Sequence, residues 1–355
     1  MKILITGTGS YIPENIIPNN YFKEHSFYNP NGNPISESAE LIAEKLKKIT
    51  GINERRYVNE EQQMYEIAVI AAIRAISDAG IDPETLDGII LAHNFGSLAF
   101  GKTQVDLLPS IASRVKHALK IKNPGCVAYD IIFGCPGWVQ GIILARQHIL
   151  VESAKRILVI GAETLSRVID PHDRDSMIYS DGSAAVILEG LETSQQRGII
   201  SVLSQTYTYE EAYYLYLGTS NKKDSDPETL YLKMHGKKIY EFALKRVPQA
   251  MKQCLDKSGI GIENVKKIFI HQANEKMDEA ILKAFYKLYD FSTPPENIMP
   301  MNIHKLGNSS VATIPTLLDM VLKGHQTEHT LEAGDVILMA SVGAGMNVNA
   351  ITYIM

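Results

Sequence analysis

The chain has 355 residues, with 35 basic and 40 acidic side chains and a formal net charge of −5. Hydrophobic residues make up 45% and charged residues 21%, which is typical of globular proteins and excludes disordered and low-complexity classes. The mild negative charge gives no reason to expect nucleic acid or an anionic membrane as partner, and three cysteines are too few for a disulfide scaffold. No apolar run approaches the roughly 18 residues that a membrane helix needs, so we expect a soluble cytoplasmic protein.

Strands and helices are predicted to alternate through the first half of the chain. Several predicted strands are almost continuously Ile and Val, as in strands that are covered on both faces. Helix 63–79 places Ile67, Ala71 and Ala75 on one face. The predicted strands lie near 2–6, 87–92, 127–132, 156–161 and 183–188. The predicted helices lie near 37–49, 63–79, 103–119 and 136–150.

The second half repeats this alternation. Its predicted strands lie near 198–207, 266–270, 335–341 and 347–354, and its predicted helices near 236–257, 274–288 and 311–323. Loops rich in turn residues occupy 26–36 and 218–228. The polar stretch 191–198 is the natural joint, so we expect two domains, residues 1–192 and 193–355.

Three features recur in order, each about half the chain length apart, which favours an internal duplication. One is a helix end, a turn and an apolar strand, one is a buried strand, and one is a glycine turn that opens a helix. The matching pairs are 79–91 with 258–270, 156–160 with 336–340, and Gly134–Cys135 with Gly307–Asn308. Alternating strands and helices in two copies predict an α/β fold with sheets faced by helices.

Cys135 stands where a strand gives way to a helix, between Gly134 and Pro136. Proline favours the first helical turn, so the cysteine should lie beside the N-cap. The helix dipole and the free backbone N–H groups stabilise a thiolate there, and a thiolate is a nucleophile suited to acyl transfer. The alternative is a packed free cysteine, which is how we interpret Cys126 and Cys254.

His271 follows an apolar strand, at the end of a sheet where α/β sites collect. Asn308 holds, in the second half, the place that Cys135 holds in the first. Taken alone, His271 is also explained as a hydrogen-bonded strand-end residue and Asn308 as an N-cap. Together the three supply a nucleophile, an imidazole and an amide donor, and the glycine loop 341–346 adds backbone N–H groups suited to an oxyanion hole.

Two other motifs have a simpler interpretation. His172, Asp173 and Asp175 could be mistaken for a metal cluster, but nothing distant completes a site, so we predict a polar turn and no metal. The segment GTGSYIP at 7–13 has two glycines of a dinucleotide fingerprint but lacks the third, and Pro13 stands where the helix should begin. A dinucleotide-dependent oxidoreductase is therefore disfavoured.

Motifs along nearly the whole chain resemble the β-ketoacyl-acyl-carrier-protein synthase III family of the thiolase superfamily. They are GTGSYIP at 7–13, TGINERR at 50–56, the Cys135 motif, RVIDPHDRDSMIYSDGSAAVIL at 167–188, HQAN at 271–274, GNSS at 307–310 and the terminal glycine loop. The resemblance implies a thiolase-like fold, in which two duplicated βαβαβαββ halves form a five-layered αβαβα sandwich, and a homodimer.

The resemblance also implies an acyltransferase that forms a carbon–carbon bond in fatty acid or polyketide synthesis. Cys135 would carry the acyl group, while His271 and Asn308 would stabilise the enolate of a malonyl-type thioester. The backbone N–H groups of Cys135 and Ala344 would form the oxyanion hole. Arg174 would lie near the coenzyme A nucleotide, and Lys276 and Lys283 would face an acidic acyl carrier protein. Coenzyme A or phosphopantetheine thioesters would be substrates, with no further cofactor.

The chain departs from the family pattern at several places. Lys45, Lys47 and Lys48 stand where the family has a tryptophan beside the adenine, and Ile49 replaces an arginine, so a carrier-protein donor competes with coenzyme A. The segment between Ala92 and Cys135 is longer than the resemblance leads us to expect.

These departures keep the alternatives open. The main one is a specialised ketosynthase of the dialkylresorcinol or pigment type, which joins an acyl chain to a β-ketoacyl thioester. The others are a cysteine-dependent thioester hydrolase and a non-catalytic binding protein.

Overall fold

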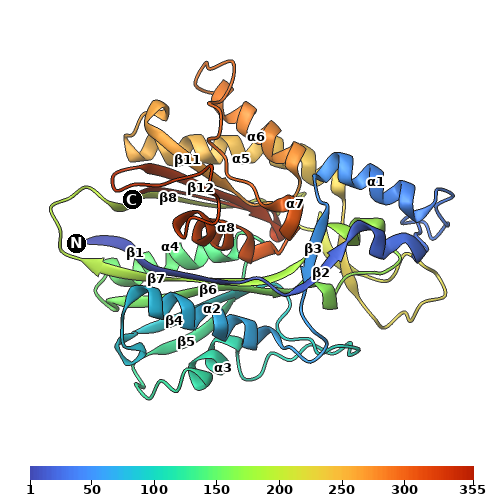
Figure 1. Ribbon diagram of the computed structural model, residues 1–355, viewed down its shortest axis with the longest axis horizontal. Helices are drawn as coiled ribbons and strands as arrows, with labels where there is room; N and C mark the ends of the chain where they lie inside the picture. The colour runs from blue at the N-terminus through green and yellow to red at the C-terminus, as the bar shows by residue number, and fades with distance from the viewer.

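The computed structural model describes residues 1–355 and contains two main sheets (Figure 1). The first has the order β1-β7-β6-β4-β5, and the second has the order β11-β12-β13-β8. The strands of the first sheet are β1 (Lys2–Tyr11), β4 (Gly88–His93), β5 (Val127–Ile132), β6 (Arg156–Thr164) and β7 (Asp181–Leu191). Those of the second are β8 (Gly198–Thr206), β11 (Val265–Ile270), β12 (Val336–Gly343) and β13 (Asn347–Ile354).

Helices form three further layers, which confirms the five-layered sandwich (Figure 1). Helices α2 (Met64–Ala79) and α3 (Ile111–Ala118) cover the outer face of the first sheet. Helices α5 (Gly236–Ser258) and α6 (Glu275–Lys287) cover the outer face of the second. Between the sheets lie α4 (Gly137–Leu150) and α8 (Thr313–Leu322), whose apolar side chains form one shared core with both sheets.

The two sheets confirm the predicted duplication. In the first, β4 runs parallel to β6, whereas β7 runs antiparallel to β6 and β1. In the second, β11 runs parallel to β12, whereas β13 runs antiparallel to β12 and β8. Strand order and direction therefore match position by position, so the turns that precede α4 and α8 meet in the central layer.

The second copy is shorter by one strand. The segment 294–302 runs beside β11, and the Ile268 N–H donates to the Ile298 carbonyl at 2.9 Å. The segment is not a strand, because Pro294, Pro295 and Pro300 have no N–H group to donate to a ladder.

Each half carries an insertion between its first strand and its first outer helix. In the first half, β2 (Asn15–Pro18) pairs with β3 (Glu54–Tyr57), and α1 (Ala39–Thr50) lies between them in the chain. In the second half, β9 (Leu215–Gly218) pairs with β10 (Tyr231–Met234) as a hairpin. The sequence analysis did not predict these short strands, nor the single-turn helix α7 (Ile303–Leu306).

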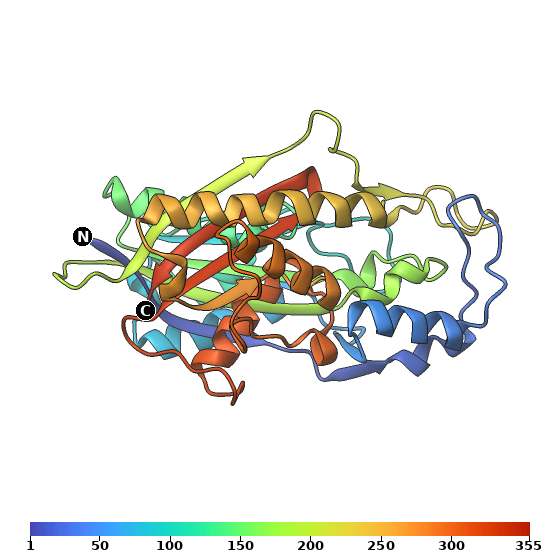
Figure 2. The same ribbon diagram turned by 90° about the horizontal axis from the view of Figure 1, so that it is seen from above.

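The loops of the two insertions meet at the end of the molecule farthest from the termini (Figure 2). The Asn221 side chain donates to the Tyr28 carbonyl at 2.9 Å, and the Tyr28 N–H donates to the His172 carbonyl at 2.9 Å. The two loops thus support each other across the interface between the halves.

The predicted helix 103–119 is wrong over its first part, since α3 begins only at Ile111. Pro109 disfavours helical backbone at the residue before it. Ser110 is the N-cap, and its hydroxyl accepts from the Ser113 N–H at 3.2 Å. Residues before the cap form a loop in which Asp106 pairs with Ser97 through an isolated bridge. Among the helices, none combines the length and the apolar character needed to cross a membrane.

Candidate active site

Cys135 lies in the tight turn that joins β5 to α4. Gly134 has φ +67°, a conformation that costs glycine nothing, and the turn delivers the cysteine immediately before the helix N-terminus. The Cys135 side chain is only partly buried and borders a cavity of about 360 Å³. A nucleophile at this position can be reached by a substrate in the cavity.

The terminal glycine loop packs directly against this turn. A Cβ atom added to Gly343 would lie 2.4 Å from the Cys135 nitrogen, and one added to Gly134 would lie 2.5 Å from the Ala344 nitrogen. Only glycine permits both close approaches, which bring the backbone of Cys135 and Ala344 together. Positive φ falls on Gly345 (74°) and not on Ala344, so alanine fits at its position without strain.

His271 follows β11 and is 3% exposed. Its Nδ1 atom lies 2.8 Å from the Thr313 hydroxyl, and its Nε2 atom makes no hydrogen bond within the chain. Burial lowers the pKa of His271 to about 4, so the ring is neutral near pH 7. A neutral ring with one nitrogen anchored presents the other nitrogen to a ligand.

Asn308 follows Gly307, which has φ +61°, in the turn before α8. Its Oδ1 atom accepts from the Ser310 N–H at 2.8 Å, so its amide nitrogen points away from that contact and makes no hydrogen bond within the chain. Asn308 is 3% exposed. The duplicated turns therefore place a thiol and an amide group in corresponding positions.

Ser310 links the three residues, and the sequence analysis missed it. Its side chain lines the same cavity as Cys135, its N–H donates to Asn308, and its carbonyl lies 3.0 Å from the Thr313 hydroxyl, which lies 2.8 Å from His271 Nδ1. Ser310 adopts φ +53°, which is strained for a residue with a side chain and is a feature that clusters at functional sites. Only the strain, which the sequence does not show, distinguishes it from an ordinary serine.

A buried acid supports Ser310 from the first half. The Asn94 amide donates to the Ser310 hydroxyl at 2.8 Å, and the Asn94 backbone N–H donates to the Glu163 carboxylate. Glu163 is the penultimate residue of the buried strand β6 and is 1% exposed. Burial raises the pKa of Glu163 to about 8.

The Cys135 thiol is neutral at rest. Burial raises its pKa to about 11, and the hydrogen bond from Ser310 only partly offsets this effect. The expected stabilisation of a thiolate by the helix N-terminus is therefore outweighed by desolvation. Because the His271 pKa is lowered as well, no thiolate–imidazolium pair is formed in advance.

Two cavities adjoin this region. We call the one of about 360 Å³ the thiol cavity; it is mostly apolar and contains no charged side chain. The second, of about 410 Å³, lies between α1, residues 174–178 and the start of α5 and α6, and we call it the entrance cavity. Its charged lining residues are Glu37, Lys45, Arg174, Asp175 and Lys237. An apolar group fits the first cavity and a polar, charged group fits the mouth of the second.

Of the predicted binding residues, Arg174 lines the entrance cavity, whereas Lys276 and Lys283 do not. Arg174 is exposed and its Nε atom lies 3.9 Å from the Asp175 carboxylate. Lys276 and Lys283 are exposed on α6, whose first turn lines the cavity through Met277.

Two other groups of polar residues have structural roles. His93 is fully buried, accepts from the Gly96 N–H at 2.9 Å and lies 3.3 Å from Asp130, which caps α3. In the turn 170–175, Asp170 and Asp173 hold the ammonium group of Lys233 at 2.5 and 3.1 Å. The sequence identified the polar turn but not Lys233, which completes it from β10.

Comparisons with known proteins identify the family. The model of 3-oxoacyl-[acyl-carrier-protein (ACP)] synthase III matches residues 129–207, and the model of its C-terminal part matches residues 255–354. A β-ketoacyl-[acyl-carrier-protein] synthase III from Staphylococcus epidermidis is 31% identical over 99% of this chain and 98% of its own length. One from Prochlorococcus marinus is also 31% identical, over 99% and 96%.

Solved structures agree. A 3-oxoacyl-[acyl-carrier-protein] synthase III from Aquifex aeolicus is 29% identical with a TM-score of 0.80, over 99% of this chain and 100% of its own. The priming β-ketosynthase of the R1128 polyketide pathway shares the fold, with a TM-score of 0.80 at 21% identity over 100% and 96% of the two chains. The chain therefore belongs to the 3-oxoacyl-[acyl-carrier-protein] synthase III family of condensing enzymes.

Proposed function

We propose that Cys135, His271 and Asn308 carry out the condensation of an acyl group with a malonyl-type thioester of an acyl carrier protein. The observation that carries the assignment is the arrangement around Ser310, which lines a cavity with Cys135, donates to Asn308 and approaches His271 through Thr313, while one imidazole nitrogen and one amide nitrogen make no hydrogen bond in the chain. Family membership supports the same reaction class.

In the first step, the Cys135 sulfur attacks the carbonyl carbon of the acyl thioester. A carbon–sulfur bond forms to Cys135, the bond to the donor thiol breaks, and the donor leaves with the proton of the Cys135 thiol. The backbone N–H groups of Cys135 and Ala344 are the proposed donors to the oxyanion, supported by the packing of the two glycine turns.

In the second step, the malonyl thioester loses carbon dioxide, and the electron pair of the broken bond forms an enolate. His271 and Asn308 are the proposed hydrogen-bond donors to the enolate oxygen, with the Thr313 hydroxyl donating to His271 Nδ1 so that the single ring proton lies on Nε2. The enolate carbon attacks the acyl-Cys135 carbonyl, a carbon–carbon bond forms, and Cys135 leaves and regains a proton. The atoms balance without a metal or a redox cofactor.

The entrance cavity is the proposed route for a phosphopantetheine arm, because its charged mouth opens toward solvent and its inner wall contains Ile178 and Met234. Arg174 is proposed to contact phosphate groups there, and exposed Lys276 and Lys283 to contact an acidic carrier protein. Both coenzyme A and carrier-protein donors fit this arrangement.

We also propose a homodimer formed along β5. This strand is an edge of the first sheet, and its ends are open, with Val127 60% and Ile132 64% exposed. An unpaired apolar edge is a template for pairing with another strand. Ile132 also lines the thiol cavity, so a second copy would close the cavity at that side. The three unpaired cysteines support a reducing, cytoplasmic compartment.

Intact mass spectrometry tests the assignment of the nucleophile. The chain is incubated with acyl-coenzyme A and acyl-carrier-protein thioesters, and the mass of the protein is followed. We expect an acyl adduct on the wild type and on Cys126→Ala, a matched change of another free cysteine, but none on Cys135→Ala. An adduct that persists in Cys135→Ala, or free acid without condensed product after malonyl thioester is added, would refute the proposal; the latter indicates a hydrolase.

Replacement of the malonyl thioester by a β-ketoacyl thioester distinguishes the proposed reaction from that of a specialised ketosynthase. The alternative requires a condensed product from the β-ketoacyl substrate. A product only from the malonyl substrate supports the proposed reaction.

A further inference from the structure

The hairpin β9–β10 forms one wall of the thiol cavity. Leu215 and Leu217 line it from β9, and Leu232 lines it from β10. Phe95 and Leu165, both from the first half, also line it. The cavity thus begins at Cys135 and is bounded by apolar side chains with no charged group in its lining, so it suits a hydrocarbon chain.

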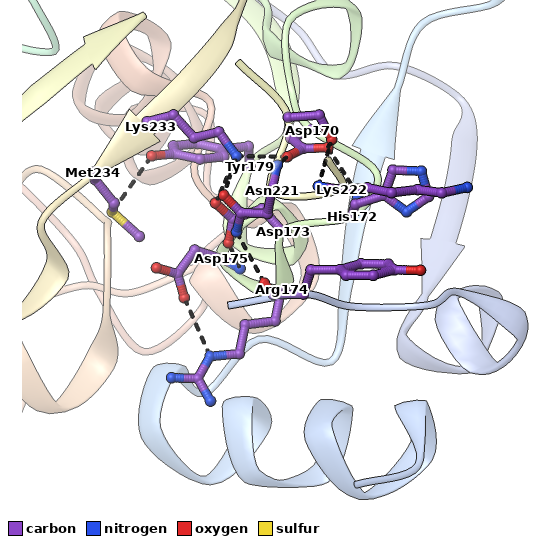
Figure 3. A network of polar contacts seen from close by, with 12 residues as sticks. Asp170, His172, Asp173, Arg174, Asp175, Tyr179, Asn221, Lys222, Lys233 and Met234 are labelled. Atoms are coloured by element: carbon purple, nitrogen blue, oxygen red, sulfur yellow. Dashed lines mark hydrogen bonds and ion pairs between the residues drawn. The ribbon is translucent and has the colours of Figure 1, made fainter. Parts of the chain in front are cut away.

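A buried ion network holds this wall in place (Figure 3). Lys233 follows Leu232 in the chain and is 5% exposed. Its ammonium group lies 2.5 Å from Asp170, 3.1 Å from Asp173 and 2.9 Å from the Asn221 side-chain oxygen. If the Lys233 ammonium group moved away from these three acceptors, the buried Asp170 carboxylate would lose its compensating charge.

Backbone contacts fix the same strand. The Leu232 N–H donates to the Val168 carbonyl at 2.8 Å, and Leu232 forms an isolated parallel bridge with Ile169. Two residues further on, the Met234 sulfur accepts from the Tyr179 hydroxyl at 3.6 Å (Figure 3). Tyr179 lines the thiol cavity and Met234 lines the entrance cavity, so β10 is anchored between the two.

The size of the cavity limits its occupant. An apolar cavity of about 150 Å³ holds benzene, whose carbon atoms number about six. At that packing, the thiol cavity of about 360 Å³ has room for roughly 14 carbon atoms. Part of this space lies at the open side near Ile132 and Leu217, so the usable length is shorter.

We propose that the acyl group carried by Cys135 is an alkyl chain of medium length, about 8 to 12 carbons, and that the anchored hairpin β9–β10 sets this limit. The inference rests on the proposed function of Cys135 and names the substrate class of that site. Each methylene buried in the cavity is expected to favour acylation by about fourfold until the cavity is full.

The test measures the rate of acylation of Cys135 by intact mass spectrometry, with S-acyl-N-acetylcysteamine thioesters from 2 to about 16 carbons. These small donors do not depend on the charged mouth of the entrance cavity. We expect the rate to rise with chain length to an optimum within the proposed range and then to fall. Acetyl or butyryl as the fastest donor would overturn the inference.

Substitutions test the wall itself. Leu232→Trp should move the optimum to shorter chains. Leu230→Trp is the matched control, because Leu230 belongs to the same hairpin region, is half-exposed and lines neither cavity. If Leu232→Trp does not fold, judged by circular dichroism, Leu217→Trp replaces it, since the Leu217 side chain is half-exposed and tolerates a larger ring.

The role of the hairpin, the substrate class and the proposed function are tested by different outcomes. An unchanged chain-length profile in a folded Leu232→Trp or Leu217→Trp variant overturns the role of the hairpin. Adducts with short donors only overturn the substrate class but leave the proposed function intact. No adduct on Cys135 with any thioester overturns the proposed function, and the inference with it.

Discussion

The turns before α4 and α8 share a glycine with positive φ but present different chemistry. Gly134 and Gly307 have φ values of 67° and 61°, and each is followed by a polar residue, two residues before α4 in the first half and five residues before α8 in the second. In the first half that residue is the partly buried thiol of Cys135. In the second it is Asn308, buried and anchored through its oxygen.

The strand ends show the same division. In the first sheet Leu91 pairs with Ile160, and in the second Ile270 pairs with Ala340, so Ala92 and His271 occupy equivalent places. Ala92 only packs, whereas His271 supplies the ring that we propose to contact the enolate. The next residues, His93 and Gln272, are both buried; His93 accepts from Gly96 in the loop that follows it, whereas Gln272 accepts from Asn302, which precedes α7. The proposed reacting group therefore occupies a position at which the duplicated backbone does not require a particular side chain.

The insertions differ more than the duplicated cores. In the first half, helix α1 lines the entrance cavity through Ile42, Leu46 and Ile49. In the second half, the hairpin β9–β10 lines the thiol cavity. The duplicated cores carry the proposed reacting groups, whereas the unrelated insertions each form part of the wall of one cavity.

The largest expected effect comes from removing the proposed enolate donors of the second half, while Cys135 of the first half still carries the acyl group. We expect His271→Ala and Asn308→Ala each to reduce the condensation rate by about 10²–10³-fold, because each removes one donor to the enolate, and to leave acylation of Cys135 intact. Product formation by liquid chromatography and adduct formation by intact mass are measured on the same samples. His148→Ala, an exposed histidine on α4, is the control and should retain both steps. Loss of acylation in either alanine variant would contradict the division.

The second prediction compares the loss of a buried lysine in the hairpin β9–β10 with the loss of an exposed lysine. Lys233→Ala should reduce the free energy of unfolding by about 3–5 kcal/mol, since it leaves Asp170 buried without its partner. Lys237→Ala removes an exposed lysine that lies 3.8 Å from Glu241, and should cost less than about 1 kcal/mol. Urea unfolding measures both. Equal effects of the two changes would show that the buried network does not hold the hairpin.

The Lys233 effect has a predicted pH dependence. Burial by itself would raise the Asp170 pKa, but hydrogen bonds from Lys233, Asn221 and His172 lower it below its ordinary value. Stability from a carboxylate with a lowered pKa is present above the ordinary aspartate pKa of about 4 and is lost as the pH falls through the folded-state value. The difference between wild type and Lys233→Ala should therefore narrow in acid, and a constant difference down to low pH would argue against the ion pair.

The smallest expected effect concerns the thiol itself. Because burial raises the Cys135 pKa to about 11, alkylation by iodoacetamide should accelerate about tenfold per pH unit between roughly pH 7 and 9, without a plateau. Ser310→Ala removes a hydrogen bond that lowers this pKa, so alkylation should slow by about fivefold at a given pH. Cys135→Ala gives the background. A plateau below pH 8 would mean that the helix N-terminus outweighs desolvation.

Much of the duplicated core could be predicted from the sequence. The buried strands of both sheets are continuous apolar runs, and α4 and α8 each follow a glycine turn, so local patterns were sufficient to locate them. The short strands β2, β3, β9 and β10 could not be found this way, because their pairing depends on partners far along the chain and most of their side chains are partly exposed. The early start predicted for α3 failed for a local reason, namely Pro109 before the cap.

The candidate site also has features that local sequence patterns predict and features that depend on long-range contacts. Cys135, His271 and Asn308 carry their own local signals: a cysteine at a strand–helix turn, a histidine at a strand end and an asparagine at the duplicated turn. The sequence alone thus determined the candidate reacting groups and the two-fold plan that brings them together.

Only the tertiary structure decided what surrounds them. The strained backbone of Ser310, the support of Glu163 through Asn94, and the burial that keeps the Cys135 thiol neutral all depend on contacts between the two halves. The capture of Lys233 by Asp170 joins residues far apart in sequence, and it shapes the cavity beside the thiol. Local patterns record which group each position can offer, whereas desolvation, strain and cavity volume arise only when distant segments pack together.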